Sequence, residues 1–276
     1  MDKVALITGA SSGIGKSAAI ELRKKGYIVY GAARRCERMV DLFEQGIRTI
    51  KLDVTDPENI DEVINEIIAE TGRIDVLVNN AGFAVYGAVE DVPMDKARSQ
   101  FEVNLFGLSE ITRKVLPYMR ALESGRIINI SSIGGKIYSP YGAYYHASKF
   151  ALEGFSDCLR YELKPYNIKV VVIQPGIIRT EWSDIASDSL LENSKNGAYA
   201  EDIKLHAKFL DKTYDPAYAS KPDVIGRLVA KAATTKNPST RYAAGKLSSM
   251  SLLFRRLFSD KIFDWVLRKQ VELLAR

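Results

Sequence analysis

The amino-acid sequence predicts an α/β fold: a single domain with a doubly wound parallel sheet, followed by a helical C-terminal extension. Short runs rich in Val and Ile alternate with amphipathic helical patterns as far as Thr180, an alternation typical of parallel strands covered on both faces by helices. A glycine-rich segment directly follows the first of these runs, at Gly9. Because strand–helix–strand crossovers are right-handed, this order favours the doubly wound arrangement.

The expected strands are short apolar runs that stop at glycine, proline or polar residues. They lie at Val4–Thr8, Ile28–Ala32, Ile47–Leu52, Val76–Val78, Arg126–Ile130 and Lys169–Ile173. Helical patterns fill the intervals between them. These helices are expected at Lys16–Lys25, Glu37–Gln45, Asp56–Glu70 with Asp56 as its cap, Met94–Leu122, and through Tyr145 to Leu163.

After Thr180 the pattern loosens. Glu181–Tyr214 is polar and ambiguous, and we expect residues 181–221 to form a flexible lid over the site. Pro222–Ala233 predicts a helix, and Thr240–Ala244 is compatible with a last short strand. The sequence therefore predicts a catalytic domain over residues 1–245 and an amphipathic helical extension over residues 246–276.

Composition narrows the classes of function. The formal charge of +5, from 39 Lys+Arg against 34 Asp+Glu, gives little support to a nucleic-acid partner. Two cysteines and two isolated histidines provide neither a disulfide framework nor metal-ligand spacing, so no metal site is expected. No signal-peptide pattern opens the sequence, and no apolar run approaches the ~20 residues of a membrane span. We expect a cytoplasmic protein.

The glycine-rich segment is a candidate site for a nucleotide phosphate. Gly9, Gly13 and Gly15 stand between the first strand and the first helix. Glycines allow a pyrophosphate to approach the backbone, and the helix N-terminus offers free N–H groups and a favourable dipole. The spacing is Gly-x-x-x-Gly-x-Gly rather than the usual Gly-x-Gly-x-x-Gly. By itself, the segment also fits a simple tight turn between strand and helix.

Tyr145 and Lys149 are a candidate catalytic pair. Four residues apart on a helix, they project from one face. An ammonium beside a phenol favours the phenolate, so we expect Lys149 to lower the pKa of Tyr145. Such a phenol suits proton donation to a carbonyl, or proton removal from an alcohol. Taken alone, the pair is also typical of an ordinary half-exposed helix surface.

The motifs taken together, in this order along the chain, resemble those of the short-chain dehydrogenase/reductase family. They are Thr8-Gly9-x-x-x-Gly13-x-Gly15, Asn79-Asn80-Ala81-Gly82, Ser131-Ser132, Tyr145-x-x-x-Lys149 and Pro175-Gly176. The resemblance covers roughly the part before Thr180 and implies a Rossmann-type fold and hydride transfer between a nicotinamide and a carbonyl/alcohol pair. It also implies a homodimer through the helices at 94–122 and at Tyr145. The overall look is similar to the hydroxysteroid-dehydrogenase-like branch.

The resemblance implies a role for each matching residue. The catalytic set would be Asn104, whose carbonyl holds a proton-relay water, Ser132, which orients the carbonyl, Tyr145, which donates the proton, and Lys149. Asp53 would bond the adenine amine and Thr180 the nicotinamide carboxamide. Residues expected along the cofactor are Gly9, Ser11, Ser12, Gly13, Ile14, Gly15, Arg34, Arg35, Asp53, Val54, Asn80, Ala81, Gly82, Tyr145, Lys149, Pro175, Gly176, Ile178 and Thr180.

The end of the second strand predicts NADP(H) as the cofactor. An NAD site needs a carboxylate there to accept from the ribose 2′-hydroxyl, and this sequence has Ala33 followed by Arg34 and Arg35. Arg34, helped by Ser11 and Arg35, suits a bidentate clamp on a 2′-phosphate. The alternative is that both arginines are solvated surface charges.

Apolar and aromatic residues after the later strands favour a bulky lipophilic ketone or alcohol as substrate. The expected substrate contacts are Val85, Ser132, Ile137, Tyr138, Tyr145 and Trp182. A 3-oxoacyl thioester is the alternative substrate, and a non-catalytic NADPH-binding sensor or scaffold is the alternative class.

Leu252–Leu274, one helix or a pair, carries an apolar stripe beside Arg and Lys residues. Such a stripe packs more often on its own domain or a second subunit than on a membrane surface.

Overall fold

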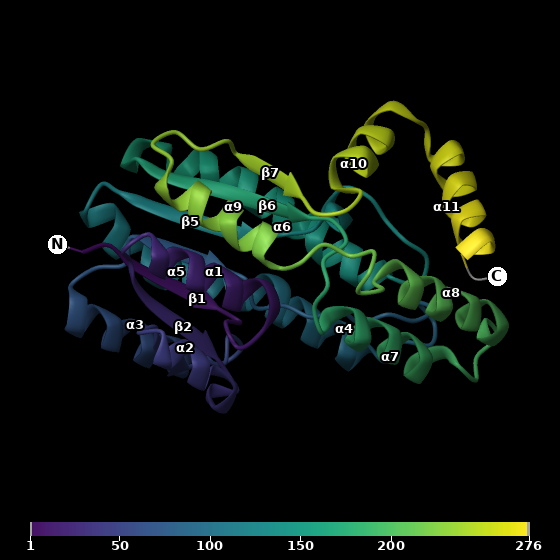
Figure 1. Cartoon of the computed structure of the whole chain (residues 1–276), viewed down its shortest axis with the longest axis horizontal. Coiled ribbons are helices and arrows are strands. Elements are labelled where there is room, and N and C mark those ends of the chain that lie inside the picture. Colours follow the sequence, from purple (N-terminus) through teal and green to yellow (C-terminus); the bar gives the residue numbers. More distant parts are fainter. Residues whose placement is uncertain (1, 275–276) are drawn as a thin grey trace.

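The computed structural model describes residues 2–274. They form a seven-stranded sheet with parallel pairing throughout, in the order β3-β2-β1-β4-β5-β6-β7 (Figure 1), which confirms the predicted α/β doubly wound fold. The strand order reverses between β1 and β4, so the crevice for a ligand is expected at the carboxyl ends of these strands. The strands are β1 Val4–Thr8, β2 Ile28–Ala33, β3 Arg48–Lys51, β4 Val76–Asn79, β5 Gly125–Ile130, β6 Ile168–Pro175 and β7 Arg241–Ala244.

Helices cover both faces of the sheet, as the alternation of strands and helices predicts. On one face lie α1 (Gly13–Lys24), α2 (Val40–Glu44) and α9 (Asp223–Thr234). On the other face lie α3 (Pro57–Thr71), α5 (Leu108–Ala121) and α6 (Ala143–Glu162). The sheet is therefore buried on both sides.

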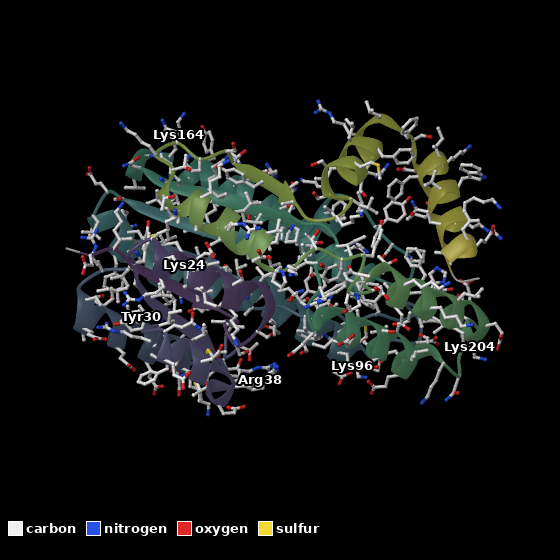
Figure 2. The ribbon with its side chains drawn as sticks, in the orientation of Figure 1. Lys24, Tyr30, Arg38, Lys96, Lys164 and Lys204 are labelled. Carbon is white, nitrogen blue, oxygen red and sulfur yellow. The ribbon has the colours of Figure 1, made fainter. Side chains whose placement is uncertain are left out.

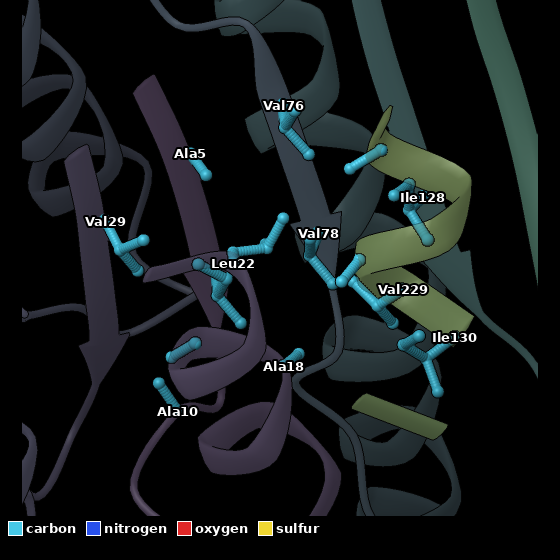
Figure 3. Close-up of a cluster of buried hydrophobic side chains, with 14 of the residues drawn as sticks. Ala5, Ala10, Ala18, Leu22, Val29, Val76, Val78, Ile128, Ile130 and Val229 are labelled. Atoms are coloured by element: carbon cyan, nitrogen blue, oxygen red, sulfur yellow. The ribbon is translucent and has the colours of Figure 1, made fainter. Parts of the chain in front are cut away.

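The side chains of β4 alternate between the two layers, as the pleat of a strand requires. Val76 and Val78 pack with Leu22 of α1 and Val229 of α9, whereas Leu77 points into the opposite core (Figure 3). Lys24, the last residue of α1, lies off the buried face and is exposed (Figure 2). Complete burial of a leucine such as Leu22 stabilises the fold by roughly 1.5–3 kcal/mol.

Two predicted helices are interrupted. The helix expected at 94–122 consists of α4 (Met94–Phe101), a π-helical turn η2 (Glu102–Gly107) and α5. The helix expected at 37–45 is a 3₁₀ turn η1 (Cys36–Met39) followed by α2. A π turn has i→i+5 hydrogen bonds in place of i→i+4, and such turns are frequent at functional sites.

The ambiguous segment after Thr180 forms two helices, α7 (Trp182–Ser194) and α8 (Ala200–Thr213). The buried side of α7 includes Ser187 and Ser194, whose hydroxyls bond Asp211 and the Ala88 N–H at 3.0 and 2.9 Å. Because serines fill part of the buried face, the apolar period that would indicate a helix is missing. The lid therefore has regular structure.

The C-terminal segment is a pair of helices, α10 (Ser248–Leu257) and α11 (Asp260–Leu274). Residues 275–276 of the predicted 246–276 extension lie outside the described residues. Figure 1 shows the pair at the end of the molecule that also carries α7 and α8. Among the described helices, none combines the length and apolar character that crossing a membrane requires.

Candidate active site

The carboxyl ends of β1, β2, β4, β5 and β6 surround a cleft of about 280 Å³. Every residue predicted along the cofactor lines it, except Gly15. These lining residues are Gly9, Ser11, Ser12, Gly13, Ile14, Arg34, Arg35, Asp53, Val54, Asn80, Ala81, Gly82, Tyr145, Lys149, Pro175, Gly176, Ile178 and Thr180. The fold thus brings together residues that are far apart in the sequence, and their individual roles remain predictions.

The glycine turn is packed too tightly for side chains. Gly9 has a φ of +66°, and a Cβ there would lie 2.9 Å from the Ala81 Cα. A Cβ on Gly15 would lie 2.3 Å from the Gly9 carbonyl oxygen, so Gly15 lets α1 approach the turn rather than contacting the cleft. The Asn80 side-chain amide fixes the turn by donating to the carbonyls of Thr8 and Gly9, at 3.0 and 3.1 Å.

The start of α1 fits a pyrophosphate. Its cap residue, Ser12, makes no side-chain capping bond, and the first turn of α1 has no acidic residue. The first N–H groups of the helix and the positive end of its dipole are therefore available to an anion. Ser11, Ser12 and Gly13 face the cleft at this point.

The end of the cleft beside β2, named here the adenosine end, has charges that suit a 2′-phosphate. Ala33, Arg34 and Arg35 line it, so the end of β2 supplies two cations and no carboxylate. Burial alone would raise the pKa of Asp53. The backbone N–H and the hydroxyl of Thr55, at 2.9 and 2.8 Å, outweigh burial and lower that pKa. Asp53 is therefore an ionised acceptor beside the arginines.

Ion pairs tether the lid at two points. Glu181, just before α7, pairs with Arg38 and lies 3.9 Å from Arg35. Glu192, near the end of α7, pairs with Lys96 of α4 at 2.8 Å. Arg38 and Lys96 are labelled in Figure 2. The first tether joins the lid to the segment after β2, so the lid and the adenosine end of the cleft are in contact.

The catalytic end of the cleft is formed by α6 and the end of β5. Tyr145 and Lys149 are 7% and 8% exposed, and both line the cleft together with Ser132. Ser132 follows β5 and caps the short turn η3 (Ile133–Gly135), where its hydroxyl accepts from the Gly134 N–H at 2.9 Å. The family's serine, tyrosine and lysine therefore lie at one place.

The expected lowering of the Tyr145 pKa is wrong for this structure. Burial raises the pKa of Tyr145 to about 12, and hydrogen bonding with Ser132 only partly offsets the rise. The ring lies 5.1 Å from that of Trp182 and 5.9 Å from that of Tyr86, centroid to centroid. These aromatic rings exclude the water that would stabilise a phenolate. Burial, to which Trp182 of the lid contributes, therefore sets the direction of the shift.

Lys149 is held by the end of β5 and is influenced electrostatically by a buried carboxylate. Its Nζ donates to the Ile130 carbonyl at 3.0 Å. Burial lowers the pKa of Lys149 to about 8, and the negative charge of Glu153 works against that change. Glu153 stands one helical turn after Lys149, a spacing that the sequence analysis did not use.

Asn104 lies in the π turn η2 and is 1% exposed. Its side-chain amide donates to the Phe83 carbonyl at 3.0 Å and to the Ser148 hydroxyl at 3.1 Å, and its Oδ1 accepts from the Phe83 N–H at 3.1 Å. Ser148 in turn donates to the Tyr145 carbonyl at 2.8 Å. Asn104 therefore ties the loop after β4 to the helix that carries Tyr145.

Three predicted substrate contacts lie away from the cleft. Val85 is buried with Val92 and Ala97 in a separate small core. Tyr138 donates to Asp264 of α11 at 2.5 Å, and Ile137 lies beside it in the turn after η3 without lining the cleft. The backbone between β5 and α6 turns Tyr138 toward α11. Only Ser132, Tyr145 and Trp182 of the expected set line the cleft.

The lid contributes cleft residues that the sequence analysis missed. Tyr214, after α8, lines the cleft, and burial raises its pKa well above the ordinary value. Phe83 and Val103 also line the cleft, beside Asn104 and Gly82. Ile185 of α7, which the sequence did indicate as a pocket residue, lines the cleft as well. Nothing in the spacing of Tyr214 marks it, because its position depends on how α7 and α8 fold back over the cleft.

Comparison with known proteins identifies the family. The family model described as short chain dehydrogenase matches residues 3–189, and the chain belongs to this family. It is therefore an oxidoreductase that acts on a carbonyl/alcohol pair. The family prediction is confirmed.

Individual relatives extend over nearly the whole chain. A 3-ketodihydrosphingosine reductase of Bacteroides thetaiotaomicron is 38% identical over 269 residues, 96% of this chain and 97% of the relative. A solved short-chain dehydrogenase of Streptomyces avermitilis has a TM-score of 0.81 and 34% identity, with 99% of this chain and 96% of that chain covered. A serine dehydrogenase complexed with NADP⁺ has a TM-score of 0.77 and 28% identity, with 88% and 95% covered. These relatives support the family and not the hydroxysteroid-like branch specifically.

Proposed function

We propose that this chain is an NADPH-dependent reductase of a lipophilic ketone, with long-chain ketones as the leading class and Tyr145 as the general acid. The proposal rests on one observation: a single cleft has basic residues at one end and the candidate catalytic residues at the other. Arg34 and Arg35 line its adenosine end, and Ser132, Tyr145 and Lys149 line its catalytic end under aromatic residues of the lid.

The catalytic end suits protonation of a ketone oxygen. Bound NADPH would supply the hydride, and the carbonyl oxygen, on which negative charge would then develop, needs hydrogen-bond donors already in place. With a pKa of about 12, the Tyr145 phenol is protonated at neutral pH and gives its proton to the more basic alkoxide. Because the Lys149 pKa of about 8 is lower, the Lys149 ammonium is an acid strong enough to reprotonate the phenolate. Ser132 orients the carbonyl.

The substrate class rests on the lid and on one relative. Trp182, Ile185 and Tyr214 give the catalytic end an apolar and aromatic wall, which suits a bulky apolar substrate. The relative named as a 3-ketodihydrosphingosine reductase acts, by its name, on a long-chain ketone. A steroid-like ketone and a 3-oxoacyl thioester are the competing substrates.

The proposal is tested by NADPH oxidation with a panel of long-chain ketones, steroid ketones, 3-oxoacyl thioesters and small ketones, with NADH in parallel. We expect turnover of a long-chain ketone with NADPH preferred. Turnover of thioesters alone would replace the substrate class. Tight NADPH binding without turnover of any carbonyl would favour the sensor or scaffold alternative.

Tyr145→Phe is the mechanistic control for this assay. It removes the acidic hydroxyl and keeps the ring that packs against Trp182. We expect turnover to fall by about 10²–10⁴-fold, the usual contribution of general acid catalysis, while NADPH affinity stays close to that of the original protein. Unchanged turnover would remove Tyr145 as the proton donor.

The proposal includes a homodimer through α6 and the interrupted helix α4–η2–α5. Phe106, Phe150 and Tyr161, on these elements, are exposed large apolar side chains, and a face of this kind is typical of subunit contacts. Light scattering should give twice the mass of one chain. A monomer mass at assay concentrations would reject the dimer and leave the reductase proposal untouched.

A further inference from the structure

The C-terminal helices α10 and α11 form a hairpin held to the domain by its inner side. Phe263 packs on Tyr138 with ring centroids 5.0 Å apart, and the Tyr138 hydroxyl bonds Asp264. The Arg255 guanidinium lies over the rings of both Tyr138 and Phe263, at 5.7 and 5.4 Å from their centroids. Phe254 completes this inner aromatic contact, 6.1 Å from Phe263.

The outer side of α10 is an apolar stripe. Met250, Leu253 and Leu257 are 61%, 57% and 66% exposed. Their spacing of three and four residues places them on one face of the helix. Leu252 and Phe254, at other angles around the helix, are partly buried.

The outer side of α11 repeats this arrangement. Ile262, Trp265 and Leu273 share one face with Lys269 between them, at spacings of three and four residues. Trp265 and Leu273 are 62% and 71% exposed. Phe263 and Val271, on the opposite face, are buried. Both helices therefore use their hydrophobic residues on two sides, and the outer side meets no other described part of the chain.

The charges beside the stripe of α10 are basic: Arg256 is exposed there, and residues 246–259 contain no Asp or Glu. On α11 the charges are mixed, because Lys261 is exposed near Asp260 and Asp264, and Lys269 pairs with Glu272 at 2.7 Å. Long basic side chains lay their methylene stems along an apolar surface and reach outward with the charge. Apolar stripes with a tryptophan and flanking Lys and Arg fit the boundary between acyl chains and anionic headgroups.

The hairpin also lies beside the proposed substrate end. Its anchor, Tyr138, follows Ser132 and η3 directly, and α11 packs on α8 of the lid. Figure 2 shows side chains projecting outward from both helices at this end of the molecule. A lipid surface bound there would adjoin the lid over the catalytic residues.

We propose that the α10–α11 hairpin docks on an anionic lipid bilayer surface. Met250, Leu253, Leu257, Trp265 and Leu273 enter the headgroup–acyl boundary, and the neighbouring basic residues contact the headgroups. Docking rests on the hairpin alone. Its use for delivering an apolar ketone to the cleft rests on the proposed function.

Sedimentation with vesicles tests the docking. The full chain is mixed with vesicles of phosphatidylcholine, or of phosphatidylcholine with phosphatidylglycerol, and the combined emission of Trp182 and Trp265 is followed in parallel. We expect binding to the anionic vesicles with a blue shift, and little binding to phosphatidylcholine alone. A chain that stays in the supernatant with both vesicle types would overturn the proposal.

Matched variants locate the binding surface. Leu253→Ser/Leu257→Ser/Trp265→Ser should weaken vesicle binding by at least about tenfold, because three large apolar contacts are lost. Val40→Ser/Phe43→Ser, which changes exposed apolar residues on α2, should bind like the original chain. Arg256→Gln/Lys261→Gln should reduce the preference for anionic vesicles. Equal binding by the triple variant would also reject the hairpin as the docking surface.

Two further readouts separate the alternatives. If the original chain is dimeric, the triple variant is monomeric and neither binds vesicles, then the face is an interface between copies and the proposal fails. Turnover of a small water-miscible ketone should be unchanged in the triple variant, because the hairpin does not line the cleft. Vesicle binding by a chain that reduces no ketone would reject the proposed function and leave the docking surface in place.

Discussion

The two ends of the cleft are built in different ways. The cofactor end comprises the glycine turn and the adenosine end. It is made largely of backbone, namely the glycine turn and the N-terminus of α1, and the Asn80 side-chain amide fixes the turn. The substrate end is the catalytic end together with the lid above it. Its wall is made of side chains that α7 and α8 bring over the cleft, among them Trp182 and Tyr214. Close backbone packing restricts which residues can occupy a position, whereas an apolar wall can be built from many different residues. The residues of the first end are therefore more closely constrained than those of the second.

Gly15→Ala should have the largest effect and should damage only the cofactor end. Its Cβ would lie 2.3 Å from the Gly9 carbonyl oxygen, and backbone cannot move aside cheaply. We expect about 1–3 kcal/mol of destabilisation from overpacking and loss of measurable NADPH binding, followed by thermal unfolding and fluorescence titration.

Gly154→Ala is the matched control for this change. Gly154 lies in α6, with no atom within 4 Å of an added Cβ, so alanine there should stabilise the helix by about 0.5–1 kcal/mol. If the two variants bound NADPH equally well, close packing at the turn would not be what shapes the phosphate site.

Arg34→Ala should sharpen the comparison within the cofactor end. Loss of a charge-assisted bond to the 2′-phosphate costs roughly 1.5–3 kcal/mol, so NADPH affinity should fall by about 10–100-fold. NADH, which lacks that phosphate, serves as the internal control and should bind unchanged. Equal losses for both cofactors would mean that Arg34 has a general structural role.

The sequence was informative where backbone geometry or spacing carries the information. Glycine spacing and the four-residue interval between Tyr145 and Lys149 are visible in a single chain, and they led to the correct fold and family. The π turn around Asn104 leaves no such trace. Serines on the buried side of α7 removed the helical period, and with the lid unassigned neither Tyr214 nor the desolvation of Tyr145 was predictable.

Trp182→Ala tests the substrate end with a smaller expected effect. The indole packs within 5.1 Å of the Tyr145 ring and 5.4 Å of the Tyr214 ring, centroid to centroid. Its removal should raise KM for a long-chain ketone about tenfold, since pocket contacts of this size are worth about 1–3 kcal/mol, and leave NADPH affinity unchanged. A matching loss of NADPH affinity would show that the two ends are not independent.

Glu153→Gln should give the smallest change in turnover, a shift of the alkaline limb of the pH profile. Glu153 accepts from Gln174 at 3.0 Å and from Arg241 at 2.9 Å, and Lys136 lies 3.4 Å away. Its negative charge raises the pKa of Lys149, which burial otherwise lowers, to a net value of about 8. Without that charge the Lys149 pKa falls further, so the ammonium is lost at lower pH.

The pH profile of kcat/KM measures this shift. In the original protein, reductase activity should decline as pH rises through about 8, and in Glu153→Gln the decline should begin at lower pH, with a few-fold deficit near neutrality. Asp157→Asn is the matched control, because Asp157 also pairs with Arg241, at 2.7 Å, but is not among the charges that shift Lys149. If the alkaline limbs of the profile were identical in all three proteins, ionisation of Lys149 would not control turnover. A shift in Glu153→Gln alone would instead mean that a carboxylate outside the cleft sets the working pH of the catalytic end, which neither the cofactor turn nor the lid controls.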